Sequence, residues 1–219
     1  MADAAPARRG LLMDWGGVMT TNLFAAFGTF CAAEQLSPDA VVRAFAEDPR
    51  GHDLLVEFEC GRLELEPFEQ GLADVLELAP DRAAGLVERL FSDMRIDPVM
   101  VAAVEAFRAA GVRTGLLSNS WGPRGASYDT ALFERLFDAL TISGELGVRK
   151  PDQRIYDAAV QHMGLAPEQL VFVDDLPGNL KPARAMGMHT IAHRDTAATI
   201  AELERVLGVD VSAAVAAAT

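Results

Sequence analysis

Residues 170–188 read LVFVDDLPGNLKPARAMGM, and this stretch indicates the fold. An apolar run from Leu170 to Val173 leads directly into two adjacent acids, Asp174 and Asp175, and a helical pattern follows. A short, continuous apolar run of this kind is typical of a parallel strand that is covered on both faces. Adjacent carboxylates repel each other, so a nearby cation would stabilise them. Alternatively, the two acids cap the next helix and need no ligand.

The same alternation of apolar runs and helical patterns extends along most of the chain. Apolar runs predict strands at Leu11 to Met13, Val112 to Leu117, Ala139 to Ile142, Leu170 to Val173 and Met188 to Ala192. Helical patterns that end at glycine lie between the later strands, and the Ala-rich run from Ser212 to Thr219 is expected to fray. These elements predict an α/β protein with a doubly wound, Rossmann-like parallel sheet of about five strands.

Residues 22–94 interrupt this alternation, because they contain helical stretches punctuated by proline and no convincing strand. We therefore predict an inserted α-helical cap domain over 21–95 and an α/β core domain formed by 1–20 and 96–219. Any hinge would lie where these parts join. The insert carries several phenylalanines that either pack the cap's own core or line a pocket for a lipid-like substrate, namely Phe24, Phe27, Phe30, Phe45, Phe58 and Phe68.

Charge and cysteine content argue against several classes of protein. The chain has 219 residues, and its net charge of −13 would repel nucleic-acid backbones and anionic membranes. Its two cysteines, Cys31 and Cys60, do not indicate a disulfide framework in a chain of this length. The apolar run before Asp14 is too short for a signal peptide, and no run is long enough to span a bilayer. We expect a cytoplasmic protein with no nucleic-acid partner and no membrane insertion. The sequence is compatible with a homodimer but does not indicate the oligomeric state.

Three further polar clusters follow predicted strands, at the edge where open α/β sheets bind ligands. Asp14 follows the first strand in LLMDWGGVMT, residues 11–20, and suits a covalent nucleophile, a metal ligand or a helix cap. Ser118 and Asn119 follow the second strand and suit phosphate oxygens, although a polar turn would look the same. Lys150 stands at an expected helix start, where either a nearby anion accompanies it or the lysine is simply solvated.

Taken in chain order, an Asp, a Ser, a Lys and an Asp pair, each after a strand, resemble the motifs of the haloacid dehalogenase superfamily. The resemblance covers nearly the whole chain, and the helical insert is similar to that superfamily's cap between its first two motifs. Three segments resemble the N-terminal phosphatase domain of soluble epoxide hydrolase and related single-domain phosphatases, namely SNSW (118–121), GVRKP (147–151) and VFVDDLPGNLKPARAMGM (171–188). The resemblance implies a Mg²⁺-dependent phosphatase that acts on a small or lipid-like phosphorylated molecule.

The resemblance also implies roles for the residues that match the motifs. Asp14 would attack phosphorus and form a phosphoaspartate, and Lys150 would neutralise charge on the nucleophile and the phosphate. The hydroxyl of Ser118 and the backbone N–H of Asn119 would hold phosphoryl oxygens. Positioning and charge neutralisation of this kind account for most of the catalysis in phosphoryl transfer.

For the metal, the resemblance implies that Asp14 and Asp174 bind Mg²⁺ together with the backbone carbonyl of Gly16. Asp175 would bind the ion directly or through water, and Asn179 would support the loop. Carboxylate and carbonyl oxygens are the ligands that Mg²⁺ prefers.

One position departs from the phosphatase pattern. Phosphatases of the superfamily carry a second Asp that protonates the leaving alcohol, and that position is Gly16 here. One explanation is that a residue of the cap, with His52 as a candidate, or a water molecule supplies the proton. A second is that the substrate has an acidic leaving group that needs little protonation. A third is that the chain binds phosphorylated ligands with little turnover. A 2-haloacid dehalogenase also lacks this Asp, but it needs neither a metal nor the acidic pair. Trp15 and Trp121, which flank motif residues, either line the pocket mouth or pack the cap against the core.

Overall fold

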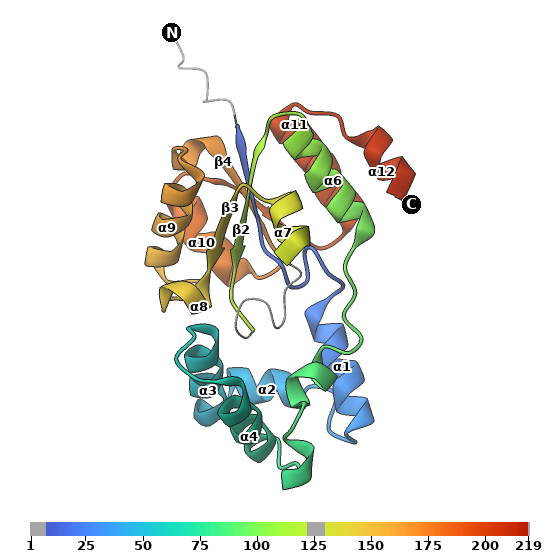
Figure 1. The fold of residues 1–219 in the computed structure, drawn as a ribbon, viewed down its shortest axis with the longest axis vertical. Helices are drawn as coiled ribbons and strands as arrows, with labels where there is room; N and C mark the ends of the chain where they lie inside the picture. Colours follow the sequence, from blue (N-terminus) through green and yellow to red (C-terminus); the bar gives the residue numbers. More distant parts are fainter. Residues whose placement is uncertain (1–7, 122–129, 219) are drawn as a thin grey trace.

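The computed structural model describes residues 8–121 and 130–218, and Figure 1 shows a sheet with its covering helices above a layer made of helices alone. The sheet is parallel and five-stranded, with the order β3-β2-β1-β4-β5. Its strands are β1 (Gly10–Met13), β2 (Arg113–Ser118), β3 (Ala139–Ile142), β4 (Leu170–Asp174) and β5 (His189–Ala192). The predicted fold class and the positions of the strands are confirmed.

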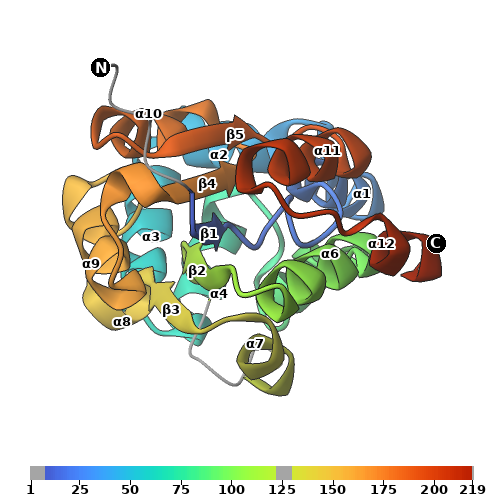
Figure 2. The same ribbon diagram turned by 90° about the horizontal axis from the view of Figure 1, so that it is seen from above.

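Helices cover both faces of this sheet, as Figure 2 shows from above. Strand β1 is buried along its whole length, with Leu11 and Met13 in one hydrophobic cluster and Leu12 in the other. Two apolar faces explain why the strand sequences are continuously apolar rather than alternating. The helices of this α/β part are α6 (Pro98–Ala109), α7 (Thr130–Leu136), α8 (Ser143–Leu146), α9 (Gln153–Met163), α10 (Pro177–Ala185), α11 (Thr196–Leu207) and α12 (Ser212–Ala218), with a 3-10 turn at Pro167–Gln169.

Local sequence explains most helix ends, and two expectations are corrected. Asp97 caps α6 by accepting the N–H groups of the second and third helical residues. Helix α9 begins at Gln153 rather than directly after Lys150, where a helix start was expected, because Asp152 caps it. The C-terminal run does not fray: it forms α12, and Val215 packs against the main hydrophobic cluster of the sheet.

The insert between β1 and α6 is helical and forms the lower layer in Figure 1; we call it the cap. Several of its phenylalanines pack one buried cluster, in which the rings of Phe58 and Phe68 stack 4.0 Å apart. Phe24 differs, because it is 44% exposed. The helices of the cap are α1 (Leu23–Ala33), α2 (Ala40–Ala46), α3 (Pro49–Glu59), α4 (Leu65–Val75) and α5 (Leu86–Leu90), with a 3-10 turn at Pro80–Arg82.

The two chain segments that join the cap to the sheet lie side by side. Thr20 and Ile96 form an antiparallel bridge, and the backbone N–H of Thr21 donates to the carbonyl of Arg95 at 2.7 Å. If the cap moves, it therefore moves about these two paired connecting segments. The boundaries of the two domains stay a prediction. In the described part of the chain, no helix is both long and apolar enough to cross a membrane.

Candidate active site

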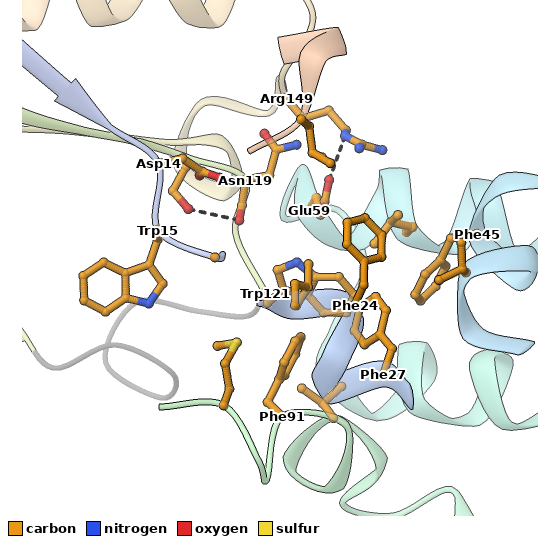
Figure 3. A pocket seen from close by; sticks show the side chains of 18 of the residues that line it. Asp14, Trp15, Phe24, Phe27, Phe45, Glu59, Phe91, Asn119, Trp121 and Arg149 are labelled. Atoms are coloured by element: carbon orange, nitrogen blue, oxygen red, sulfur yellow. Dashed lines mark hydrogen bonds and ion pairs between the residues drawn. The ribbon is translucent and has the colours of Figure 1, made fainter. Parts of the chain in front are cut away.

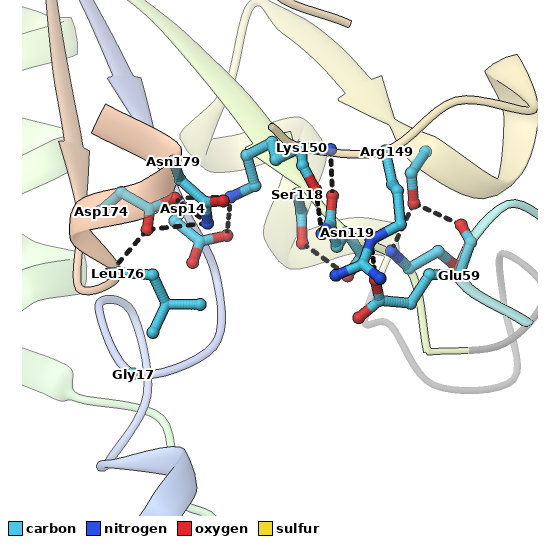
Figure 4. Close-up of polar contacts among 12 residues, drawn as sticks. Asp14, Gly17, Glu59, Ser118, Asn119, Arg149, Lys150, Asp174, Leu176 and Asn179 are labelled. Atoms are coloured by element: carbon cyan, nitrogen blue, oxygen red, sulfur yellow. Dashed lines mark hydrogen bonds and ion pairs between the residues drawn. The ribbon is translucent and has the colours of Figure 1, made fainter. Parts of the chain in front are cut away.

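The carboxyl ends of the central strands bring the predicted residues together. Asp14 follows β1, Asp174 ends β4, and the ammonium group of Lys150 lies between their side chains. Lys150 Nζ donates to Asp14 Oδ1 and to Asp174 Oδ2, each at 2.7 Å (Figure 4). Lys150 is only 1% exposed, so these two carboxylates replace the water that a buried ammonium group would otherwise need.

Further contacts fix the orientation of Asp174. Asn179, in the first turn of α10, donates its amide to both carboxylate oxygens, at 3.0 and 3.1 Å. The backbone N–H of Leu176 adds a bond of 2.8 Å to Asp174 Oδ1. Asn179 thus lies where the sequence predicted a supporting residue, and it holds Asp174 rather than facing solvent.

The segment after β2 is tied to the backbone of Lys150. The Asn119 side chain accepts the Lys150 N–H at 2.9 Å and donates to the Lys150 carbonyl at 3.3 Å. Ser118 ends β2 and is buried, and its hydroxyl donates to the Asn119 carbonyl at 3.3 Å. The predicted phosphate-binding residues are therefore held beside the lysine by hydrogen bonds of their own.

Negative charge is in excess at this end of the sheet. Asp14, Asp174 and Asp175 each offer a carboxylate oxygen, and these oxygens lie within 4.8 Å of one another. Burial raises the pKa of Asp14 to about 7; Lys150 lowers it, and the neighbouring Asp174 raises it further. Burial, together with Asp174, also raises the pKa of Asp175 to about 6. Three clustered carboxylates with one buried lysine suit a divalent cation that prefers oxygen ligands, so these residues fit Mg²⁺.

The two glycines after Asp14 serve different purposes. Gly17 has φ +78°, and a Cβ there would lie 2.6 Å from Asp175 Oδ2, so the turn needs glycine. A Cβ on Gly16 would meet nothing within 4 Å. The position at which phosphatases carry their second Asp thus has room for a side chain.

Trp15 packs edge-on against Phe133 at 4.6 Å in the hydrophobic core of the sheet, and it also reaches the cavity described next.

A cavity of about 880 Å³ lies between this charged end and the cap. Aromatic side chains form much of its wall, as Figure 3 shows, and they are Phe24, Phe27, Phe45, Phe91 and Trp121. Some phenylalanines, such as Phe27 and Phe45, both pack the cap and line the cavity, while the lipid-like nature of the substrate stays a prediction. Trp121 likewise lines the cavity and packs against the cap, with its ring 4.8 Å from Phe91.

Sequence reasoning missed one pair of residues in the cavity wall, and one candidate lies outside that wall. Glu59, the last residue of α3, is buried, and its Oε2 lies 2.7 Å from Nε of Arg149. The available signal was an acid between two apolar residues, Phe58 and Cys60, at the end of an amphipathic helix. His52 is exposed near the start of α3 and lies outside the cavity lining, so its candidacy as a proton donor is not supported.

The family of the chain follows from comparison with known proteins. Residues 9–187 match the haloacid dehalogenase-like hydrolases, and the chain belongs to this family of enzymes. Among curated relatives, the mouse acyl-CoA dehydrogenase family member 10 is 29% identical over 209 residues, which cover 91% of this chain and 19% of that protein. Rat bifunctional epoxide hydrolase 2 is 36% identical over 118 residues, covering 52% of this chain and 21% of the relative. The chain thus spans about a fifth of the length of these relatives.

Other relatives are closer to this chain in length. A sesquiterpene phosphatase of Aspergillus oryzae is 26% identical over 153 residues, covering 69% of this chain and 78% of that protein. A solved HAD family enzyme from Bacteroides thetaiotaomicron, in complex with magnesium and inorganic phosphate, has a TM-score of 0.64 at 22% identity, covering 88% of this chain and 99% of that chain. A dehalogenase with an intermediate complex has a TM-score of 0.67 at 19% identity, covering 94% and 100%. At these identities the solved structures establish the fold alone.

Proposed function

We propose that this hydrolase is a Mg²⁺-dependent phosphomonoesterase that acts through a phosphoaspartate on Asp14. The observation that carries the proposal is the convergence of Asp14, Lys150, Asp174 and Asp175 at one end of a cavity whose opposite wall is rich in aromatic side chains. A relative described as a phosphatase and a structural neighbour that binds magnesium and phosphate support the same chemistry.

The metal would be held by Asp14, Asp174 and Asp175, with the backbone carbonyl of Gly16 as a further oxygen ligand. When bound, Mg²⁺ supplies positive charge that neutralises the phosphate and the clustered carboxylates. The hydrogen bond from Lys150 holds the Asp14 carboxylate in one orientation and offsets its charge as a dianionic phosphate approaches.

In the first step, a carboxylate oxygen of Asp14 forms a bond to phosphorus as the bond between phosphorus and the ester oxygen breaks. The leaving alcohol departs into the cavity. The Ser118 hydroxyl and the Asn119 backbone N–H would hold the phosphoryl oxygens during this transfer. In the second step, water attacks phosphorus, which regenerates Asp14 and releases inorganic phosphate.

The cavity favours a substrate with a sizeable apolar group. Its aromatic wall belongs mainly to the cap, and its volume of about 880 Å³ exceeds what phosphate itself needs. The similarity to a sesquiterpene phosphatase supports an apolar leaving group of the lipid-like class. Residues of the cap would therefore select the substrate, while the strand ends would carry out the reaction.

Two alternatives remain distinct from this proposal. A 2-haloacid dehalogenase is favoured by a relative from Pseudomonas that is 28% identical over 135 residues. The clustered Asp174 and Asp175 argue for a metal instead. A weakly active phosphate-binding protein is favoured by glycine at position 16. A cytoplasmic location and the absence of nucleic-acid partners stay predictions from composition.

Hydrolysis of p-nitrophenyl phosphate, with Mg²⁺ and with a chelator, tests the proposal. We expect metal-dependent hydrolysis, and we expect Asp14→Asn to lower kcat by about 10³-fold or more because the nucleophile is lost. A cooperative unfolding transition of Asp14→Asn, measured in Mg²⁺, would control for misfolding. Metal-independent release of chloride from 2-chloropropionate would favour the dehalogenase, and phosphate binding without hydrolysis would favour the binding protein.

A further inference from the structure

The proposed reaction needs a proton for its leaving group, and position 16 does not supply it. Among the described residues that line the cavity, the carboxyl groups outside the metal cluster belong to Glu59, Glu69 and Glu88. Glu69 accepts the backbone N–H groups of Gly85 and Val87 at 3.1 and 2.9 Å, one on each carboxylate oxygen, and Glu88 is exposed. Glu59 therefore differs from the other two and requires its own explanation.

Glu59 is 4% exposed, and its Oε2 is buried without a hydrogen-bond partner among the described residues. Nε of Arg149 approaches that oxygen to 2.7 Å, but it too makes no hydrogen bond within the described chain. Buried polar atoms normally have a hydrogen-bond partner, so an oxygen without one requires an explanation, and a catalytic role is one such explanation. The backbone carbonyl of Glu59 accepts the hydroxyl of Ser143, so the residue is anchored to the α/β part of the protein.

The position of Glu59 relative to the nucleophile suits a role at the leaving group. In both close-ups, Asn119 lies between Asp14 and Glu59 (Figures 3 and 4). A phosphoryl group held at Asn119 would therefore have the nucleophile on one side and Glu59 on the other. Phosphoryl transfer places the attacking and leaving oxygens roughly in line on opposite sides of phosphorus. The leaving oxygen would then emerge toward Glu59 and the apolar cavity.

We propose that Glu59 is the acid and base of the reaction and takes the place of the carboxyl group that is absent at position 16. This inference rests on the proposed phosphatase function. As the bond from phosphorus to the ester oxygen breaks, the Glu59 carboxyl donates its proton to that oxygen and the alcohol leaves. The Glu59 carboxylate then accepts a proton from the water that attacks the aspartyl phosphate, which restores Asp14 and the protonated Glu59.

The surroundings of Glu59 are compatible with both protonation states. Burial raises the pKa of Glu59 to about 7, while Arg149, Lys150 and the Asn119 side chain lower it. Burial therefore favours the protonated form before the first step, and Arg149 stabilises the carboxylate that the first step leaves behind. Because Glu59 belongs to α3 of the cap, the acid reaches the substrate only when the cap lies against the α/β part.

A series of phosphate esters that differ in the acidity of the leaving alcohol tests this inference. We expect Glu59→Gln to lower kcat by about 10²-fold or more for alkyl phosphates and by less than about tenfold for p-nitrophenyl phosphate, whose leaving group departs without a proton. Asp53→Asn, which removes an exposed acid from the same helix, should change neither value. Equal losses for both classes of ester would point to a structural role and would overturn the proposal.

A second variant separates chemistry from packing. The Cβ of residue 16 has room, so Gly16→Asp can be added to Glu59→Gln, and we expect it to restore part of the lost activity toward alkyl phosphates only. No restoration, in a folded double variant that still hydrolyses p-nitrophenyl phosphate, would contradict the assignment.

The unaltered protein gives a measurement that does not depend on the folding of any variant. Its rates should depend only weakly on the acidity of the leaving alcohol, because the alcohol is protonated as it leaves. A steep dependence overturns the role of Glu59 and leaves the phosphatase function intact. A failure to hydrolyse any ester, p-nitrophenyl phosphate included, overturns the phosphatase function itself.

Discussion

The two sides of the cavity are built from different kinds of contact. On the side of the sheet, Lys150, Asp14 and Asp174 are joined by charged hydrogen bonds of 2.7 Å, and Asn179 holds Asp174 in place. On the side of the cap, aromatic rings pack against one another. Trp121 belongs to the segment after β2, and its ring packs against the rings of the cap. The charged hydrogen bonds at the sheet fix the positions of single side-chain atoms, whereas the aromatic packing of the cap forms an apolar surface of defined shape.

This difference separates the reaction from the choice of substrate. Hydrogen bonds to ionised groups depend strongly on distance and direction, so substitutions there should affect the chemical step. Packing of rings tolerates changes of shape, so substitutions there should affect which leaving group fits. The predictions below test the separation, from the largest expected effect to the smallest.

Lys150→Met tests the polar side most severely. The variant leaves Asp14 and Asp174 buried without their cation, so we expect a loss of stability of about 3 kcal/mol without metal and a loss of kcat of about 10³-fold. Mg²⁺ should recover part of the stability but little of the activity, which is measured by urea unfolding and by p-nitrophenyl phosphate hydrolysis.

The control for this variant is Lys181→Met, which removes the same charge from an exposed position. If Lys150→Met retained nearly full activity, the buried lysine would have only a structural role. The polar side would then not be the part of the cavity that carries out the reaction.

Phe24→Ala tests the apolar side. Phe24 lines the cavity but is 44% exposed, so its loss should disturb the fold little. We expect the KM for a long-chain alkyl phosphate to rise roughly tenfold, since about 1.5 kcal/mol of apolar burial is lost, while the KM for p-nitrophenyl phosphate changes little.

Leu146→Ala is the matched control, because Leu146 is 38% exposed and lies outside the cavity lining. Equal effects of Phe24→Ala on both substrates would mean that the aromatic wall does not select the leaving group.

Glu34→Gln tests whether ion pairs inside the cap only stabilise it. Glu34 accepts hydrogen bonds from Arg82 at 2.6 Å and Arg89 at 3.1 Å, and the bonds from Arg82 in particular lower its pKa. We expect Glu34→Gln to lower the free energy of unfolding by about 1 kcal/mol near pH 7 and to leave kcat unchanged.

The pH dependence of this effect follows from the lowered pKa. A carboxyl with a lowered folded-state pKa contributes its stability above its unfolded pKa and loses it as the pH falls through the folded value. The difference between Glu34→Gln and the native protein should therefore persist near pH 7 and shrink below about pH 4.5, the ordinary value for glutamate. A difference that does not change with pH would exclude the ion pair as its cause.

The sheet and its polar edge were predictable because their signals are local. A continuous apolar run identifies a buried strand, and an acid at its end identifies the edge at which ligands bind, so Asp14 and Asp174 could be located from sequence. Their convergence on Lys150 is present in the structure, and the catalytic roles themselves stay predictions. The family was also predictable, because the order of the motifs is specific.

Other features depended on contacts between distant segments. The sequence places Glu59 between two apolar residues but does not show what covers it, and the packing of α3 against α8 buries it beside Arg149. His52, on the same helix, had the chemistry of a proton donor but is exposed and lies outside the cavity lining. The Ala-rich C-terminus was misjudged for the same reason, since its order comes from packing against the sheet cluster rather than from its own propensity.

The bridge between Thr20 and Ile96 has a consequence for how the chain folds. Met13 of β1 pairs with Leu116 of β2, although the whole cap lies between them in the sequence. Joining such distant segments costs loop-closure entropy and slows folding. If the cap folds early and forms this bridge, the bridge holds together the two segments that connect the cap to the sheet. The effective loop between β1 and β2 is then short, rather than the full length of a disordered cap.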